Sequence, residues 1–260
     1  MVTSDDYGIT YGGTDGVLTA CRQGILTQTG LFSNMECAKY AVDRMSKEFP
    51  NICLGIDINL VCGNPVSNPE DIPSLVESNG AFRSSGSHRE EDKTNPEHIP
   101  YEEAYLETKN QVEKFIELAG KKPEYLNGHS YSTDLTRKAM SEIAKEYGIP
   151  QLMDVLRKNN LKGGGATAPW NTKPFPIEEQ IKANPVSWFV EGKLTYLEDA
   201  LKNDGVAHIH VHAGFVDAEI FKLSTYTIIR AKDLELITSP QLLKWVKDND
   251  VELISMKDLV

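Results

Sequence analysis

The stretch that decides the fold is "ECAKYAVDRMSKEFPNICLGIDINLV", residues 36–61. Its first part, 36–49, has apolar residues at the spacing of an amphipathic helix, and Pro50 follows where that helix should end. Its second part, 52–61, is an almost continuous apolar and β-branched run, which is typical of a strand buried on both faces. A helix that leads directly into a buried strand is the repeating unit of a parallel α/β sheet.

The same alternation continues along the rest of the chain. Helical spacing recurs in five further segments: 16–25, 101–120, 134–148, 195–204 and 240–249. Strand-like runs occupy 25–33, 123–130, 149–156, 206–212 and 251–256, and a short one precedes Asp5. Repeated strand–helix units predict a parallel sheet with right-handed crossovers. Seven or eight such units favour a (β/α) barrel, with residues 1–260 as a single α/β domain.

Two long segments interrupt this rhythm. Residues 62–100 are rich in Pro, Ser, Asn, Gly and charged residues, and 157–194 contain several prolines and the triplet "GGG" at 163–165. Loops of this length in a compact domain are usually lids or binding loops. The triplet lacks the sequence context of a phosphate-binding loop, so we interpret it as a flexible loop.

Composition restricts the partners and the compartment. The formal net charge of −11 argues against a nucleic-acid or anionic membrane partner, because both require clustered Lys and Arg. The four cysteines show no CxxC spacing, which indicates free thiols in a reducing compartment. We find no signal peptide, and no apolar run approaches the ~20 residues of a membrane span. We therefore expect a cytoplasmic protein without a membrane partner.

Polar residues stand at the ends of the predicted strands. Asp5 and Asp6 end the first strand, Asp57 lies in "GIDINL", His129 ends "YLNGHS", and His212 ends "VAHIHVH". The carboxyl ends of the strands of a (β/α) barrel converge on one site. We therefore expect Asp6, Asp57 and His129 to meet His212 in space.

Such a group suits metal-assisted hydrolysis. Carboxylates and an imidazole can hold a divalent cation, which acidifies a bound water and polarises a substrate carbonyl. In the adjacent pair, one aspartate would ligate the cation and the other would accept a proton. The alternative is that "SDDYG" forms a solvated turn. His208, His210 and His212 share one face of their strand, and we expect His212 to be catalytic and the other two to line the inner wall.

Several segments, in order, resemble the motifs of the YdjC-like carbohydrate deacetylases. They are "TSDDYGIT" (family "NADDFGLS"), "GILTQTGLFSN" ("GIVTSTSLMVN"), "LGIDINLVCGNPVS" ("GLHLNLTEGxPLS"), "KKPEYLNGHSYS" ("RPTHLDSHQHVH") and "HVHAGFVD" ("CHPGYVD"). The closing segment, 224–259, is also similar to that of the family. The similarity covers almost the whole chain.

The resemblance implies a distorted (β/α) barrel that forms homodimers and removes acetyl groups from N-acetylated sugars with a divalent metal. By motif position, Asp5 would be the general base and His212 the general acid. Asp6, Asp57 and His129 would be the metal ligands. Asn59, Tyr131 and Arg230 would contact the substrate, although Arg230 could instead orient a site aspartate or form a surface salt bridge.

The chain departs from the family motifs at two places. Asp57 stands where "GLHLNL" has a ligand histidine, and residues 127–132 keep one histidine, His129, of the motif "DSHQHVH". A ligand set richer in oxygen shifts the expected metal toward Mg²⁺, with Mn²⁺ or Zn²⁺ as alternatives.

We therefore predict a metal-dependent hydrolase that removes the N-acetyl group from an acetylated amino sugar or short oligosaccharide, phosphorylated or not. Two alternatives stay open. The chain could be a degenerate member that binds sugar without hydrolysis, or a hydrolase of another carbohydrate bond. A glycosidase would need two carboxylates about 5–9 Å apart and no metal.

Overall fold

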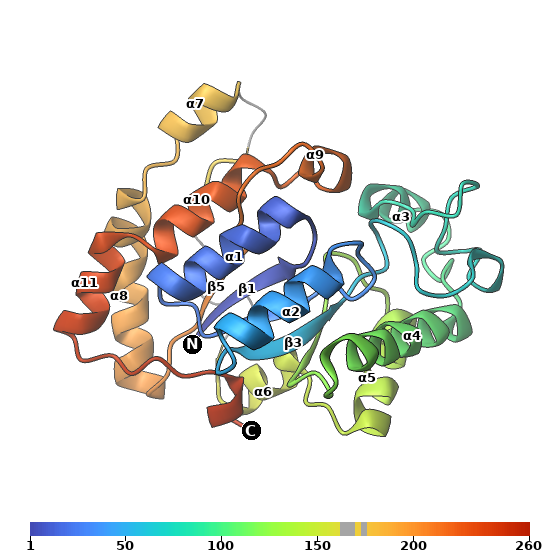
Figure 1. Ribbon diagram of the computed structural model, residues 1–260, viewed down its shortest axis with the longest axis horizontal. Coiled ribbons are helices and arrows are strands. Elements are labelled where there is room, and N and C mark those ends of the chain that lie inside the picture. Colours follow the sequence, from blue (N-terminus) through green and yellow to red (C-terminus); the bar gives the residue numbers. More distant parts are fainter. Residues whose placement is uncertain (162–169, 173–175) are drawn as a thin grey trace.

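The computed structural model describes residues 1–161, 170–172 and 176–260 (Figure 1). Helices surround a central parallel sheet. The strands are β1 (Val2–Tyr7), β2 (Gln28–Leu31), β3 (Cys53–Ile58), β4 (Leu126–Gly128) and β5 (Ile209–Val211). The glycine triplet at 163–165 lies outside the described residues.

The strand order is β4-β3-β2-β1-β5, and every pairing is parallel. Each residue of β1, β2 and β3 is buried, as expected for central strands covered by helices on both faces. Asp57 pairs in register with Asn127 on β4, and Thr3 pairs with His210 on β5. Parallel pairing thus brings the carboxyl ends of all five strands to one edge, where the polar residues gather.

All six segments predicted as helical contain helices. These are α1 (Tyr11–Gln23), α2 (Ala38–Glu48), α4 (Tyr101–Ala119), α5 (Asp134–Tyr147), α8 (Ser187–Asp204) and α11 (Pro240–Asp248). Helix α5 shows why: Thr133 caps its first turn by accepting a hydrogen bond from the backbone of Thr136, and Gly148 ends it at φ 64°. Further helices are α3 (Ser85–Glu91), α6 (Leu152–Lys158), α7 (Ile177–Lys182), α9 (Ile220–Leu223) and α10 (Ile228–Ile237), with short 3₁₀ turns at Pro69–Asp71 and Met256–Asp258.

Two segments predicted as strands have other structures. The segment 149–156 starts beside β4, where the backbone N–H of Leu126 donates to the carbonyl of Pro150, and then becomes α6. Its apolar residues Leu152, Val155 and Leu156 have helical spacing and are buried. The segment 251–256 forms no strand and ends in a 3₁₀ turn.

These corrections change the expected architecture. Within the described ranges the sheet has five strands, fewer than the seven or eight expected, and β4 and β5 form its two edges. The described part of the chain therefore forms a five-stranded parallel α/β sheet, a half-barrel, in place of the barrel of seven or eight strands that the sequence predicted. One large apolar core joins the sheet to its helices and includes residues such as Val17, Leu54 and Phe115.

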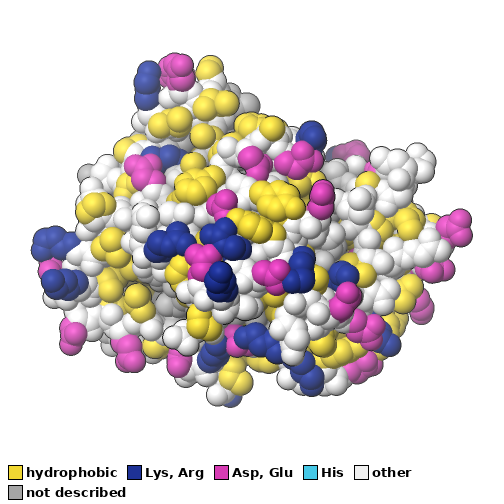
Figure 2. Space-filling model, in the orientation of Figure 1, with side chains coloured by type: hydrophobic (Ala, Val, Ile, Leu, Met, Phe, Trp, Pro, Cys, Tyr) yellow, Lys and Arg dark blue, Asp and Glu magenta, His cyan; other side chains and the backbone are white. Residues whose placement is uncertain are grey.

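The exposed helical faces carry mixed charge. Over α1 and α2, Lys and Arg side chains lie beside Asp and Glu side chains (Figure 2), for example in the ion pair between Arg22 and Glu48 at 2.6 Å. Among the described residues, no helix is both long and apolar enough to cross a membrane.

Candidate functional site

Asp5 and Asp6 lie side by side at the carboxyl end of β1, and both are buried, with 7% and 2% of their surface exposed. Neighbouring residues of a regular strand point to opposite faces of the sheet. Asp6 departs from this geometry, since its φ of 66° lies in the left-handed region that non-glycine residues seldom adopt. Both carboxylates thereby line the same cavity.

Asp6 uses its two carboxylate oxygens differently. Oδ2 accepts a hydrogen bond of 2.7 Å from the buried guanidinium of Arg230. Oδ1 lies 2.8 Å from Nδ1 of His129, yet no group in the described ranges donates a hydrogen bond to it. Burial alone would raise the pKa of Asp6, but His129 and Arg230 hold that pKa well below its usual range. Asp6 is therefore an ionised carboxylate whose Oδ2 pairs with Arg230 and whose Oδ1 contacts the imidazole of His129.

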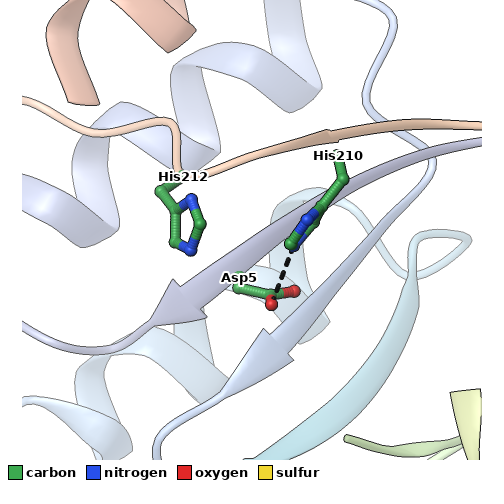
Figure 3. Close-up of side chains that lie close together, drawn as sticks. All are labelled: Asp5, His210 and His212. Atoms are coloured by element: carbon green, nitrogen blue, oxygen red, sulfur yellow. Dashed lines mark hydrogen bonds and ion pairs between the residues drawn. The ribbon is translucent and has the colours of Figure 1, made fainter. Parts of the chain in front are cut away.

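Asp5 also uses its two carboxylate oxygens differently (Figure 3). Its Oδ2 lies 2.9 Å from Nε2 of His210 and accepts a hydrogen bond of 3.1 Å from the amide of Asn127. Its Oδ1 is buried and has no hydrogen-bond partner within the described part of the chain. Burial favours the neutral acid, but His210 and His212 lower the pKa of Asp5. Asp5 is thus an ionised base whose second oxygen remains available.

The two histidines near Asp5 have opposite protonation preferences. Burial opposes the charged form of His210, but the charge of Asp5 and its hydrogen bond raise the pKa of His210 to about 9. Burial lowers the pKa of His212, although Asp6 acts in the other direction. The backbone N–H of His212 donates to Asp233 at 2.8 Å, and its ring stands 5.1 Å from that of Tyr226. These shifts favour the charged form of His210 and the neutral form of His212.

Asp57 lies behind these residues and is fully buried, and it does not line the cavity. Its Oδ2 accepts a hydrogen bond of 3.0 Å from the backbone N–H of Asp6, and its Oδ1 accepts one of 3.2 Å from Asn127. A Cβ atom on Gly30 would come within 2.1 Å of Oδ1, so the carboxyl group occupies a recess that only glycine leaves open. Burial, followed by the charges of Asp5 and Asp6, raises the pKa of Asp57 well above its usual range.

The cavity has a volume of about 750 Å³, within the range typical of small-ligand sites. It contains the five candidate groups Asp5, Asp6, His129, His210 and His212, together with Arg230. The segment predicted as a binding loop contributes Arg89 and the amino end of α3 to its wall. A smaller cavity of about 400 Å³ adjoins it along residues 127–130.

The carboxylate oxygens and imidazole nitrogens in this cavity are suitable ligands for a divalent cation. Asp6 and His129 offer two ligand atoms 2.8 Å apart without a hydrogen bond that satisfies Oδ1 of Asp6. Asp5, His210 and His212 each offer a ligand atom within 4.8 Å of the others. Buried carboxylate oxygens without a donor are costly unless a cation supplies the missing partner. Carboxylate and imidazole ligands suit Mg²⁺, Mn²⁺ or Zn²⁺.

Sequence comparison decides the family. The profile of the YdjC-like protein family matches residues 1–248. The chain belongs to the YdjC-like family. The family predicted from the motifs is therefore confirmed.

Relatives of the YdjC-like chain carry a functional name. It is 32% identical over 267 residues to carbohydrate deacetylase 2 of Listeria innocua, with 100% of this chain and 98% of the relative covered. It is 32% identical over 251 residues to a carbohydrate deacetylase of Oceanobacillus iheyensis, with 95% and 98% covered. A solved structure from Enterococcus faecalis V583, assigned to cellobiose-phosphate cleavage, superposes with a TM-score of 0.76 at 18% identity over 100% of this chain and 98% of that one. That structure supports the fold alone.

Most of the site residues predicted from the YdjC-like motifs lie together in the structure. Asp5, Asp6, His129, His212 and Arg230 all line the cavity, whereas Asp57 lies behind it. The guanidinium of Arg230 pairs with Asp6 at 2.7 Å in the buried site, so its ion pair is not at the surface.

Two residues predicted to bind substrate have structural contacts instead. Asn59 is fully buried, and its side chain holds the backbone of Val61 and Cys62. Tyr131 donates to Asp92 at 2.8 Å and stacks on His88, so it lines the smaller cavity.

Sequence reasoning also missed several groups of this YdjC-like site. His210 was assigned to the inner wall, yet it contacts Asp5 directly. Asn127 joins Asp5 to Asp57, and Asp233 holds the backbone of His212. Asn127 could have been predicted, because it stands at the end of a strand predicted to lie beside the strand of Asp57.

Proposed function

We propose that this YdjC-like protein is a metal-dependent deacetylase that hydrolyses the N-acetyl amide of an amino sugar or short oligosaccharide. The observation that carries the proposal is the pair of buried carboxylates, Asp5 and Asp6, at the same cavity. Oδ1 of Asp5 has no hydrogen-bond partner among the described residues, and Oδ1 of Asp6 contacts only the imidazole of His129. The names of its relatives support this substrate class.

Asp6 and His129 would hold the cation, and a cation bound there polarises the acetyl carbonyl and acidifies a water. Asp57 was expected to be the third ligand. Its hydrogen bond to the backbone of Asp6 supports a positioning role instead. Magnesium remains the expected metal, because it prefers carboxylate oxygen, which Asp6 supplies.

The residues of the chain carry the proton transfers. The carboxylate of Asp5 removes a proton from the water that attacks the acetyl carbon, and His210 keeps Asp5 ionised and oriented. His212, whose lowered pKa favours the neutral form, would take up a proton and pass it to the leaving nitrogen. The C–N bond breaks, and acetate and a free amine are the products.

Release of acetate tests this proposal. The purified chain is incubated with N,N'-diacetylchitobiose and related acetylated sugars, with Mg²⁺, Mn²⁺, Zn²⁺ or EDTA. We expect acetate release that EDTA abolishes and added metal restores. Release of monosaccharides without acetate would favour a hydrolase of another carbohydrate bond. Thermal stabilisation by the sugar without turnover would favour the degenerate, sugar-binding alternative.

The homodimer and the single-domain organisation of residues 1–260 belong to the same proposal. The family resemblance implies the first, and a large apolar core that joins the sheet to its helices supports the second. Light scattering at several concentrations, together with a single cooperative unfolding transition, tests both.

A further inference from the structure

His210 of β5, His212 just after that strand and Asp5 of β1 bring three metal-binding atoms together. His210 and His212 are two residues apart, so their side chains share one face of the strand. Figure 3 shows both rings on the same side as the carboxylate of Asp5. One ligand atom of each residue lies within 4.8 Å of the other two.

We propose that Asp5, His210 and His212 form a second cation site, which takes a transition metal such as Zn²⁺ and is separate from the Asp6–His129 pair. Two imidazoles and one carboxylate are the ligand types that suit zinc, whereas magnesium prefers an all-oxygen set. Three protein ligands leave the fourth tetrahedral position open to water. Zinc ligands stand about 2.0–2.2 Å from the ion, and zinc binding would displace the proton that His210 shares with Asp5.

A second observation points independently to a ligand. Oδ1 of Asp5 belongs to a residue that is only 7% exposed, and no donor reaches this oxygen in the parts of the chain that the structure describes. The same carboxylate already uses Oδ2 toward His210 and Asn127. A cation would give Oδ1 the partner that it lacks.

Occupancy of this site has a functional consequence, which rests on the proposed function. Asp5 and His212 are the groups assigned to accept and donate protons, and a ligating carboxylate or imidazole cannot do either. Zinc at this second site should therefore inhibit the magnesium-loaded enzyme. The same donors would serve catalysis when free and inhibition when bound.

The experiment measures binding first, with the full chain in saturating Mg²⁺. Zn²⁺ is titrated by calorimetry, and Co²⁺ is added separately to record visible d–d absorption. We expect one equivalent of Zn²⁺ to bind and Co²⁺ bands to appear. His210→Leu should weaken zinc binding by more than about tenfold, since even residues that only support a ligand change metal affinity by about 10–100-fold. His208→Gln is the matched control, because His208 directly precedes β5 and lies outside the three ligands, where it contacts Thr3.

The outcomes separate this proposal from the proposed function. Zinc binding that His210→Leu leaves unchanged, or an absence of any zinc site beyond the magnesium site, overturns it even if acetate is released. If no sugar is deacetylated, a zinc site that depends on His210 still supports it. The Co²⁺ spectrum is recorded on the unmodified chain, so this test of the site does not depend on whether a variant folds. In an active enzyme, zinc should suppress acetate release at the concentrations that fill the site.

Discussion

The carboxylate of Asp57 holds the backbone of Asp6: its Oδ2 accepts the Asp6 N–H at 3.0 Å. Asp6 needs this support, since a non-glycine residue at a φ of 66° is strained. The bond turns the Asp6 side chain toward the cavity, next to Asp5. Gly30 on the neighbouring strand makes room for the carboxyl group. Asp57, which stands where the family motif has a histidine, thus supports Asp6, the proposed ligand.

The recess at Gly30 predicts a specific loss of stability. In Gly30→Ala, the new methyl group would meet all three carboxyl atoms of Asp57 at 2.1–2.4 Å. We expect the free energy of unfolding to fall by about 1–3 kcal/mol, as for other overpacked cores. Urea denaturation of the purified variant measures this change.

A double mutant identifies the cause. Asp57→Ala removes the clashing atoms, so Gly30→Ala should cost less in that background than in the wild type. Gly86→Ala is the control, because the nearest atom to its new Cβ would be Ser84 Oγ at 3.5 Å, an ordinary contact. Equal costs of Gly30→Ala in both backgrounds would show that Asp57 does not fill the recess.

The position of Asp57 also predicts how metal affinity responds to substitution. Asp57→Asn keeps one acceptor for the Asp6 N–H, and Asp57 lies behind the cavity, so Mg²⁺ affinity should change by less than about tenfold. Asp6→Asn removes a ligand and should cost more than about tenfold. Calorimetric Mg²⁺ titrations of both variants make the comparison. Equal losses would restore Asp57 to the ligand set that the sequence predicts.

The sequence predicted the parts of this fold that local patterns determine. The central strands and the amphipathic helices followed from the period of their apolar residues, as for α2 and β3. The structure of the short segment 149–156 did not follow from its sequence, because such an apolar run suits a strand or a buried helix equally well. The strand count, and with it the barrel, depended on those ambiguous runs.

The candidate site divided in a similar way. Asp5, Asp6, His129 and His212 could be predicted, since parallel strands bring their carboxyl ends to one edge. The turned-away side chain of Asp57 could not, because it depends on Gly30 of another strand and on the backbone of Asp6. Side-chain direction at a strand end is a tertiary property. Period and spacing do not encode it.

The buried pair of Arg230 and Asp6 predicts a large effect of charge removal. Arg230→Met leaves the Asp6 carboxylate buried without its cationic partner, because both side chains are almost fully buried. We expect a loss of about 3–5 kcal/mol in the free energy of unfolding in EDTA. Added Mg²⁺ should recover part of it by supplying another positive charge. Arg22→Met is the control, since Arg22 pairs with Glu48 at the surface, where ion pairs contribute little. Equal effects of the two variants would refute a structural role for Arg230.

A histidine pair outside the cavity predicts acid sensitivity. His88 is fully buried, and its Nδ1 lies 2.8 Å from Nε2 of His98. Burial, with help from Arg83 and His98 and against Glu91 and Asp92, lowers the pKa of His88 to about 4. Between about pH 6.5 and pH 4, this histidine is protonated in the unfolded chain but neutral in the folded chain.

The lowered pKa of His88 makes the fold less stable in acid. The contribution of neutral His88 to stability is complete above about pH 6.5 and is lost as the pH falls toward 4. His88→Gln should flatten this part of the stability profile measured by urea denaturation. His208, whose pKa burial lowers to about 3, should leave a residual slope in the variant. An unchanged profile in His88→Gln would mean that His88 does not titrate abnormally.

Asp5 carries the most direct prediction for the proposed reaction. Asn127 and His210 hold its carboxylate, and its Oδ1 is free at the cavity. Asp5→Asn keeps the size of the side chain but cannot accept a proton, so kcat for acetate release should fall by about 10²–10⁴-fold. KM and the affinity for Mg²⁺ should change little if Asp6 and His129 bind the metal. Asp43→Asn is the control, because Asp43 pairs with Lys39 on the exposed surface of α2. A variant Asp5→Asn that retains kcat would move the base to another residue, and one that loses Mg²⁺ binding would make Asp5 a ligand of that cation.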